Sequence, residues 1–149
     1  MPTDDWSKFW DLIKDIKIGM FTAFSNDGLL HSRPMATQNR ADDRNDRLWF
    51  FMSRDSEPGL DLARNRSVSV AYADPRSGAY ISVAGHAAVF EDAQTKKDLW
   101  TPAAQAWFPG GPEDPEVTLV SVAIEHVEYW TVDSNRMVQL VRHGEVRMD

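Results

Sequence analysis

The sequence predicts a mainly β protein of the α+β class, built as a small antiparallel barrel with peripheral helices. Two observations lead to this fold class. Short apolar or alternating runs are separated by turn-forming clusters such as Asn26-Asp27-Gly28 and residues 74–78. The predicted strands also do not alternate with full-length helices, which argues against a doubly wound parallel sheet. At 149 residues, we expect residues 1–149 to form a single domain.

The first elements follow from hydrophobic periodicity. Trp6, Phe9, Trp10 and Ile13 recur at helical spacing and predict a helix over residues 4–15. After this helix, the period changes to that of extended chain. Apolar alternation or short apolar runs predict strands at residues 18–24, 29–38, 48–53, 67–73, 80–90 and 117–132.

Two further helical segments are expected between these strands. Residues 56–65 fit a short helix that Ser56 can cap. Residues 92–107 fit a helix that is broken or kinked at Pro102. Two helical turns separate Trp100 from Trp107, so both rings are expected on one face, either packed in the core or a dimer contact, or held as a lid over a planar ligand.

The last strand changes phase along its length. Its apolar residues occupy one face up to Ile124 and the opposite face from Val127 onward. A β-bulge near Glu125-His126 would bring the two halves into register, because a bulge adds one residue to one strand of a pair. The tail after Asp133 is only weakly patterned.

Composition excludes several functional classes. The net charge of −7 argues against non-specific binding to nucleic acid or to an anionic membrane. There are no cysteines, so disulfides and thiol catalysis are excluded. No apolar run approaches the ~20 residues that span a bilayer, and we expect a cytoplasmic protein. The four histidines lack ligand spacing, so no metal site is predicted, and no catalytic residue stands out.

The stretch LLHSRPMATQ, residues 29–38, raises the first functional question. It reads as a strand, yet Pro34 removes a ladder donor directly after His31, Ser32 and Arg33. Proline is tolerated in a strand only at an edge or a bulge. This segment therefore either forms an edge of the sheet or faces a ligand.

The loop from Ser53 to Ser56 is the second candidate site. A helix start surrounded by hydroxyl groups can bind an anion through its unpaired N–H groups and its dipole. The simpler interpretation is that Ser56 only caps the short helix. Glu57 favours that interpretation, because its carboxylate would compete with a phosphate.

Five segments in this order resemble one family. They are TAFSNDGLLHSRPM (22–35), LWFFMSRDS (48–56), AYISVAGHAAV (79–89), DLWTPAAQAWFPGGPEDP (98–115) and VEYW (127–130). The chain resembles the bacterial general stress proteins among the FMN-binding split barrels, relatives of pyridoxamine 5′-phosphate oxidase. The resemblance covers residues 5–132 and rests mainly on the RPM strand and the LWTP…AWFPGGPEDP segment.

The resemblance implies a six-stranded antiparallel split β-barrel that forms a homodimer with FMN at its interface. In such proteins the flavin ring lies against the strand that matches residues 31–35, and the backbone of the next strand lines the same pocket. The phosphate lies near the loop and helix start, and an aromatic residue arrives from the partner subunit. The implied cofactor-binding residues are His31, Ser32, Arg33, Pro34, Met35, Phe51, Met52, Ser53, Ser56 and Trp107.

The chain departs from the family pattern where cations are expected. Glu57-Pro58 follows Ser56 in place of basic residues, Gln38 replaces a lysine, and Met52 replaces a threonine. Each lost cation removes a charge-assisted phosphate contact worth ~1.5–3 kcal/mol. We therefore expect weak flavin retention unless Arg33, Arg54 or another residue substitutes for the lost cations, and we expect no oxidation of pyridoxamine phosphate.

The resulting functional prediction is a general stress type flavoprotein that binds FMN, or FAD as well. Its activity would be that of a flavin-dependent oxidoreductase acting on an unidentified small molecule or a nicotinamide partner. The alternative is a non-enzymatic flavin reservoir or sensor. A third alternative is a pocket for haem or a deazaflavin, as in other split barrels.

Overall fold

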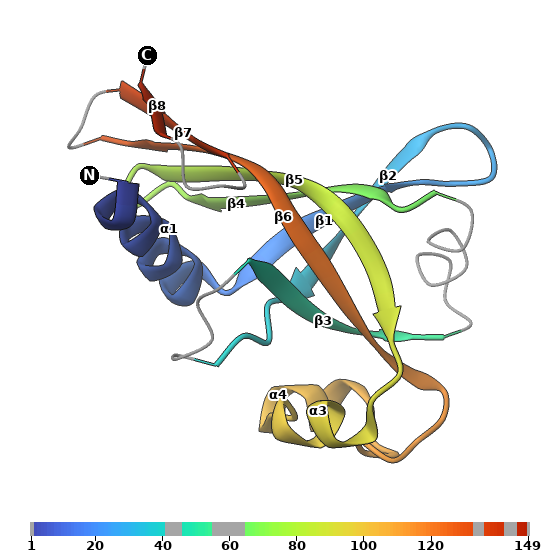
Figure 1. The fold of residues 1–149 in the computed structure, drawn as a ribbon. Helices are drawn as coiled ribbons and strands as arrows, with labels where there is room; N and C mark the ends of the chain where they lie inside the picture. The colour runs from blue at the N-terminus through green and yellow to red at the C-terminus, as the bar shows by residue number, and fades with distance from the viewer. Residues whose placement is uncertain (1, 41–45, 55–64, 133–135, 142–145, 149) are drawn as a thin grey trace.

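The computed structural model describes residues 2–40, 46–54, 65–132, 136–141 and 146–148. One eight-stranded antiparallel sheet curls on itself, with a helix at one end and two short helices beneath its lower strands (Figure 1). In chain order the elements are α1 (Pro2–Ile16), β1 (Ile18–Phe24), β2 (Leu30–Ala36), β3 (Arg47–Ser53), β4 (Ser67–Asp74), β5 (Ala79–Phe90), α3 (Ala93–Asp98), α4 (Pro102–Trp107), β6 (Val117–Thr131), β7 (Arg136–Val141) and β8 (Val146–Met148).

The six strands expected from the sequence, β1 to β6, form the split barrel, and this part of the prediction is confirmed. The strand order is β2-β1-β4-β5-β6, and β3 joins the other side of β6. β2 and β3 are therefore the two ends of the curled six-stranded part. The weakly patterned tail forms β7 and β8, which extend the sheet from β6 in a way that the sequence did not predict.

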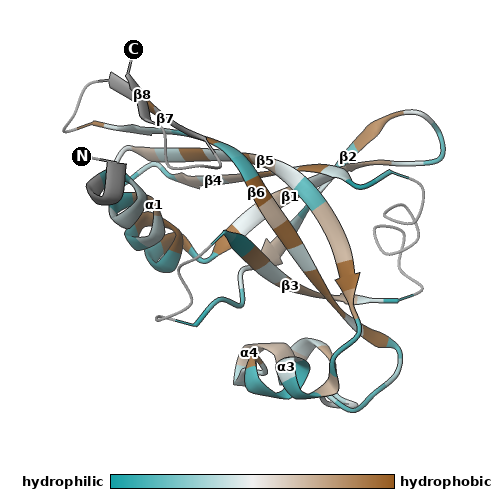
Figure 2. Cartoon of the chain, in the orientation of Figure 1, coloured by the Kyte–Doolittle hydropathy of each residue, from teal (hydrophilic) through white to brown (hydrophobic). Residues whose placement is uncertain are grey.

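The main core lies inside the curl and is closed at one end by α1. Phe9 is fully buried and packs edge-to-face against Trp10, with ring centroids 5.0 Å apart. The helix forms because its apolar residues recur on one stripe that can face this core. The strands alternate buried and exposed residues, as a half-buried antiparallel sheet requires. The core cluster joins apolar residues of α1 with apolar residues of the strands, and Figure 2 shows the hydrophobic stretches along these elements.

A second, smaller core lies on the outer face of β3 and β6. The helices α3 and α4 cover this face, and Leu99 and Ala104 pack against Trp49 and Phe51. Phe51 stacks edge-to-face on Trp100 with ring centroids 4.8 Å apart. One strand is thus buried on both faces, which explains why residues 48–52 are apolar without alternation.

The predicted β-bulge is confirmed at the expected position. β5 pairs with β6 through Ala84 and His126 and then through Gly85 and Ile124, which leaves Glu125 as the extra residue. A Cβ atom at position 85 would collide with the carbonyl oxygen of residue 123, so only glycine fits beside the bulge.

The break at Pro102 is confirmed, but its consequence for the tryptophans was predicted wrongly. Thr101 caps α4, accepting a hydrogen bond from the Ala104 N–H, and Pro102 takes the first helical position. The chain changes direction between α3 and α4. Residues on the two sides of this break therefore do not follow one helical spacing. Trp100 packs on Phe51, whereas Trp107 is 82% exposed, and the two rings do not share a face.

The predicted short helix over 56–65 lies almost entirely outside the described residues. No helix in the described part of the chain is long and apolar enough to cross a membrane.

Candidate functional site

The candidate site lies along the split between β2 and β3. The two strands approach where β2 ends, and they diverge from there toward the tip of the β1–β2 hairpin and the end of β3 (Figure 1). The split therefore has a closed end and an open end. Both strands border it with backbone edges that have no ladder partner among the described strands.

The closed end is held by hydrogen bonds that clasp the two strands. The Gln38 N–H donates to the Trp49 carbonyl oxygen at 2.8 Å. Asn39 adds both halves of its amide: Nδ2 donates to the Arg47 carbonyl oxygen at 2.8 Å, and Oδ1 accepts from the Trp49 N–H at 2.9 Å. We call Gln38 and Asn39 with these three bonds the clasp. Neither residue stood out in the sequence as part of a site.

The edge position of β2 explains Pro34. β2 pairs with β1 along its whole length, and its other side borders the split. A proline can be tolerated at such an edge, where a lost N–H breaks no second ladder. The edge interpretation of this stretch is thereby confirmed.

The predicted residues of β2 divide between two faces of the strand. His31, Arg33 and Met35 are half-buried and share the inner face, while Ser32 and Pro34 are exposed on the outer face. Arg33 lies opposite Phe21, a core residue, in the β1–β2 register. A ligand in the split would therefore meet Arg33 from inside the barrel edge, and could not contact all five side chains from one side.

His31 is held by its own hairpin. Its Nε2 lies 2.9 Å from the Asp27 carboxylate, whose other oxygen accepts from the Leu29 N–H at 2.9 Å. The Leu29 N–H, and then His31, lower the pKa of Asp27 below its usual range. The Ser32 hydroxyl is also engaged, with Oγ 2.6 Å from the Thr22 hydroxyl. Both residues thus have a structural role in the hairpin.

The predicted residues of β3 offer their backbone rather than their side chains. Phe51 points into the smaller core and Met52 into the main core, and both are nearly fully buried. With their side chains in the two cores, these residues have their backbone groups left to offer at the edge of β3. Ser53 is half-buried at the end of the strand, and Ser56 lies outside the described residues.

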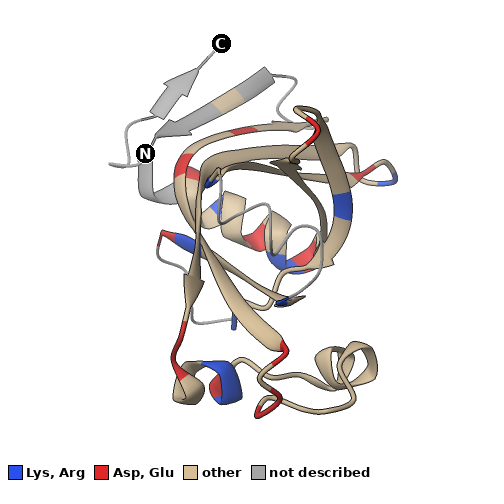
Figure 3. Cartoon of the chain, turned by 90° about the vertical axis from the view of Figure 1, so that its right-hand side faces the viewer, with Lys and Arg blue, Asp and Glu red and all other residues tan. Residues whose placement is uncertain are grey.

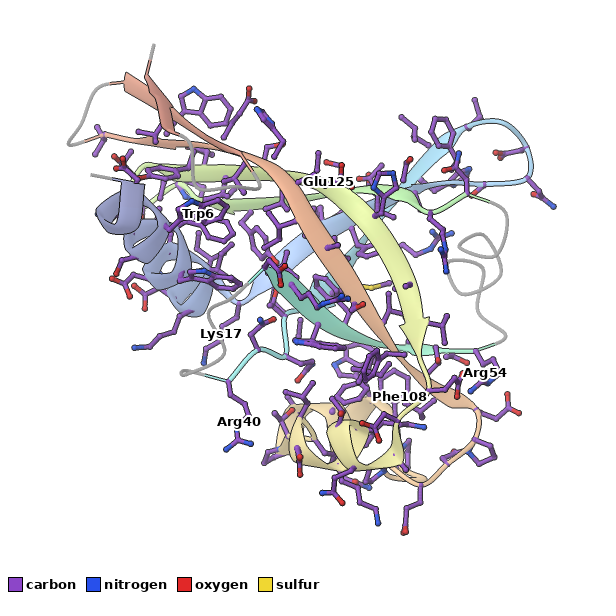
Figure 4. The ribbon with its side chains drawn as sticks, viewed as in Figure 1. Trp6, Lys17, Arg40, Arg54, Phe108 and Glu125 are labelled. Atoms are coloured by element: carbon purple, nitrogen blue, oxygen red, sulfur yellow. The ribbon has the colours of Figure 1, made fainter. Side chains whose placement is uncertain are left out.

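Arg54 is directed away from the split. Its Nε donates to the Pro115 carbonyl oxygen at 3.0 Å, and its guanidinium forms an ion pair with Glu91 at 3.1 Å. Figure 4 shows Arg54 beyond the end of β3, on the side of the α3–α4 region. In this arrangement the Arg54 guanidinium is engaged with groups away from the split.

Thr118 is a buried polar residue that the sequence did not single out. It pairs with Met52 in the β3–β6 register and is 3% exposed. Its Oγ1 is buried without a hydrogen-bond partner among the residues that the structure describes. Buried hydroxyl groups are almost always paired, so an orphaned one beside the end of β3 suggests an absent ligand or water.

Gln38 replaces an expected lysine and has another role. Its Oε1 accepts from the Thr101 hydroxyl at 3.3 Å, which links the end of β2 to the start of α4. The uncharged Gln38 side chain therefore connects a strand to a helix, where the expected lysine would have provided a positive charge.

Comparisons with known proteins agree with the fold. The model of the family described as pyridoxamine 5′-phosphate oxidase like matches residues 4–146. A structure of a protein related to general stress protein 26, from Clostridium acetobutylicum, superposes with a TM-score of 0.79 at 18% identity, covering 93% of this chain and 94% of that one.

Two further relatives are more similar in sequence. The general stress FMN/FAD binding protein of Xanthomonas citri is 28% identical, with a TM-score of 0.75 and coverage of 87% of this chain and 89% of that one. Protein bli-3 of Neurospora crassa is 29% identical over 118 residues, which cover 74% of this chain. The match spans 56%, just over half, of that curated relative's length.

Proposed function

The chain belongs to the pyridoxamine 5′-phosphate oxidase-like family, and we propose that it is a flavin-binding protein that holds FMN in the split between β2 and β3. The observation that carries this proposal is that β2 and β3 border the split with backbone edges that are unpaired among the described strands. The Thr118 hydroxyl adds to it, since it is buried beside Met52 of β3 without a partner among the described residues. A ligand rich in hydroxyl and carbonyl groups would supply the missing partners.

The residues present fit a flavin with a weakly held phosphate. Arg33 supplies a positive charge on the inner face of β2, and the edge of β3 supplies N–H and C=O groups near Phe51 and Met52. Thr118 would donate to or accept from a polar oxygen of the ligand at the open end. When bound, the flavin would supply one- and two-electron redox chemistry.

The missing cations favour looser contacts at the phosphate end. Arg54 is engaged with Glu91, and Gln38 with Thr101. A loosely held phosphate leaves room for an adenylate extension, so we propose that FAD binds as well as FMN. The X. citri relative, named as an FMN/FAD binding protein, is consistent with this range.

We propose that the functional form is a homodimer. The outer face of β1 and β2 exposes Met20 and Leu30, at 42% and 61%, and Trp107 is 82% exposed at the end of α4. Figure 2 shows hydrophobic residues at the tip of the β1–β2 hairpin. A second copy on this face would bury these side chains and could bring its Trp107 to the split.

The activity that fits best is flavin-dependent oxidoreduction of a small molecule or a nicotinamide cofactor. No acid or base is required for such a step, because hydride transfer depends mainly on placement against the flavin. The alternative is a flavin reservoir or sensor without turnover, which the lost phosphate cations favour. Anaerobic mixing of the flavin-loaded protein with NADH or NADPH distinguishes the two: a flavin that never bleaches contradicts the nicotinamide reductase.

The proposal as a whole is tested by titrating the protein with FMN and with FAD. Flavin binding is followed by its visible absorbance and by quenching of tryptophan fluorescence. We expect saturation below ~1 mM for both flavins, since that dissociation constant corresponds to only about −4 kcal/mol. Binding that does not saturate in this range would contradict the cofactor assignment.

A further inference from the structure

A cavity of about 510 Å³ lies at the closed end of the split, where the clasp residues Gln38 and Asn39 form part of its lining. The second half of α1, the start of β1, the end of β2 and the start of α4 surround it. Its volume is that of a small-ligand pocket. None of the residues that we assign to the flavin lines it.

The floor of the cavity is apolar. Trp10 and Ile13 face it from α1, Ile18 from β1 and Ala36 from the end of β2. Ile18 is 51% exposed although it is large and apolar. Such a surface is stabilised by an apolar group that displaces water from it.

The rim of the cavity is basic, although the chain carries a net charge of −7. Lys14, Lys17 and Arg40 line it, all three side chains are exposed, and no carboxylate lines it among the described residues. Figure 4 shows Lys17 and Arg40 on the same side of the molecule, between the end of α1 and the α3–α4 region.

Two features of α1 oppose an anion at this rim. Asp11 and Asp15 lie on the same helix, where Figure 3 shows basic and acidic residues together, and α1 ends at Ile16 with the negative pole of its dipole. Neither carboxylate lines the cavity, whereas three cations do. Among the described residues, the charged groups that line the cavity are therefore all basic.

We propose that this cavity binds a small molecule with an apolar, ring-sized body and a single anionic group, such as an aromatic carboxylate or sulfonate. The body would lie on Trp10, Ile13 and Ile18, and the anion would meet Lys14, Lys17 and Arg40. The Gln38 and Thr101 side chains, which hydrogen bond to each other at 3.3 Å, border the same cavity and add polar groups between floor and rim.

The test uses two fluorescent probes that differ only in charge. 8-Anilinonaphthalene-1-sulfonate carries the apolar body with an anion, and N-phenyl-1-naphthylamine carries the same body without it. We expect the sulfonate to bind saturably and about tenfold more tightly than the neutral probe, since three exposed charge contacts together are worth roughly this factor. Equal affinities for the two probes would overturn the proposal.

Two sets of variants locate the site. Lys14→Gln/Lys17→Gln/Arg40→Gln should weaken the sulfonate about tenfold and leave the neutral probe unchanged. The matched control Lys8→Gln/Arg66→Gln/Arg76→Gln removes the same charge from exposed positions outside the cavity, and should have no more than a twofold effect. Equal losses in the two triple variants would overturn the proposal.

Filling the cavity provides a second measurement. Ala103 is exposed on α4 and lines the cavity, so Ala103→Trp should block both probes without disturbing the core. If both probes still bind Ala103→Trp with unchanged affinity, they bind elsewhere and the proposal fails.

A competition separates this site from the flavin site. We expect protein saturated with FMN to bind the sulfonate with unchanged affinity, and the Lys14, Lys17 and Arg40 triple variant to bind FMN like the unmodified chain. Displacement of the sulfonate by FMN would show one shared site and overturn the proposal. Failure to bind FMN would contradict the proposed function and leave the probe results standing.

Discussion

The two ends of the split between β2 and β3 differ in whether their polar groups have hydrogen-bond partners. At the closed end, Gln38 and Asn39 satisfy the backbone groups of β3 with three hydrogen bonds. Toward the open end, the strand edges diverge, and the hydroxyl of Thr118, which is paired with Met52 of β3, is buried without a partner among the described residues. The closed end therefore contributes to stability without a ligand, whereas the open end lacks interactions that a ligand can supply.

The difference matters because folding and binding make separate demands. A satisfied polar network fixes one arrangement of the chain, while an unsatisfied buried group raises the free energy of the ligand-free state. Substitutions at the closed end should change stability, and substitutions at the open end should change flavin affinity. The following experiments are arranged from the largest expected effect to the smallest.

Asn39→Ala should produce the largest effect, a loss of about 2–3 kcal/mol in the free energy of unfolding. It removes the partners of the Trp49 N–H and the Arg47 carbonyl oxygen together. Urea denaturation measures the change. Asn39→Asp keeps the acceptor for Trp49 and should lose about half as much; equal losses in both variants would argue against two separate bonds.

Arg33→Ala should weaken FMN at least tenfold, a loss of about 1.5–3 kcal/mol of binding free energy for a charge-assisted contact. Its free energy of unfolding should change by less than about 1 kcal/mol, because the residue is only half-buried at an edge. FMN titration and urea denaturation of the same sample provide both values.

Arg33→Lys is the matched control and should recover part of the affinity for FMN. Lysine keeps the positive charge but lacks the planar set of N–H donors of the guanidinium group. If Arg33→Ala is unfolded, or if its affinity for FMN is unchanged, Arg33 has a structural role in the sheet and does not bind the flavin.

Thr118→Val should increase the stability of the ligand-free protein and decrease its affinity for FMN. Replacing an unpaired buried hydroxyl by a methyl group of similar shape should stabilise the ligand-free protein by about 1 kcal/mol. It should also weaken FMN about fivefold, by a lost hydrogen bond of ~1 kcal/mol. Thermal unfolding without and with FMN measures both changes.

Thr131→Val, a buried threonine at the far end of the same strand, is the control and should leave FMN affinity unchanged. If Thr118→Val destabilises the ligand-free protein as much as the control does, the Thr118 hydroxyl already has a hydrogen-bond partner in the absence of flavin.

Acidification should have the smallest effect and should act on the hairpin that carries His31. The Leu29 N–H and then His31 lower the pKa of Asp27 below its usual 3.8, so the folded state favours the carboxylate. This contribution is present above pH 3.8 and is lost as the pH falls through the lower pKa of the folded state.

Urea denaturation as a function of pH should therefore show a shallower acid loss for Asp27→Asn than for the unmodified chain. Identical acid profiles would show that the Asp27 hairpin contributes nothing to stability.

The fold was largely predictable because its signals are local. Residues 18–24 alternate cleanly and form β1, and the phase change at Glu125 revealed the bulge before any contact was known. The break at Pro102 was visible, but the directions of Trp100 and Trp107 were not, because helical spacing loses its meaning across a break. β7 and β8 were missed because residues after 133 alternate only weakly.

The site was predictable only in part. The residues of β2 and β3 were named through the resemblance, and the structure places them on the two borders of the split. The clasp was missed because Asn39 bonds to Arg47 and Trp49 only once the two strands converge. Thr118 was missed because an unpaired hydroxyl group is a property of the packed interior that no sequence pattern reports.

The central claim is that a flavin binds in the split, and amide chemical-shift mapping during an FMN titration tests it most directly. We expect one flavin per chain below ~1 mM, with the largest shifts at the β2 and β3 edges and at Thr118. Amides of β7 should not respond. Shifts centred elsewhere on the described sheet, or no saturable response, would contradict the assignment.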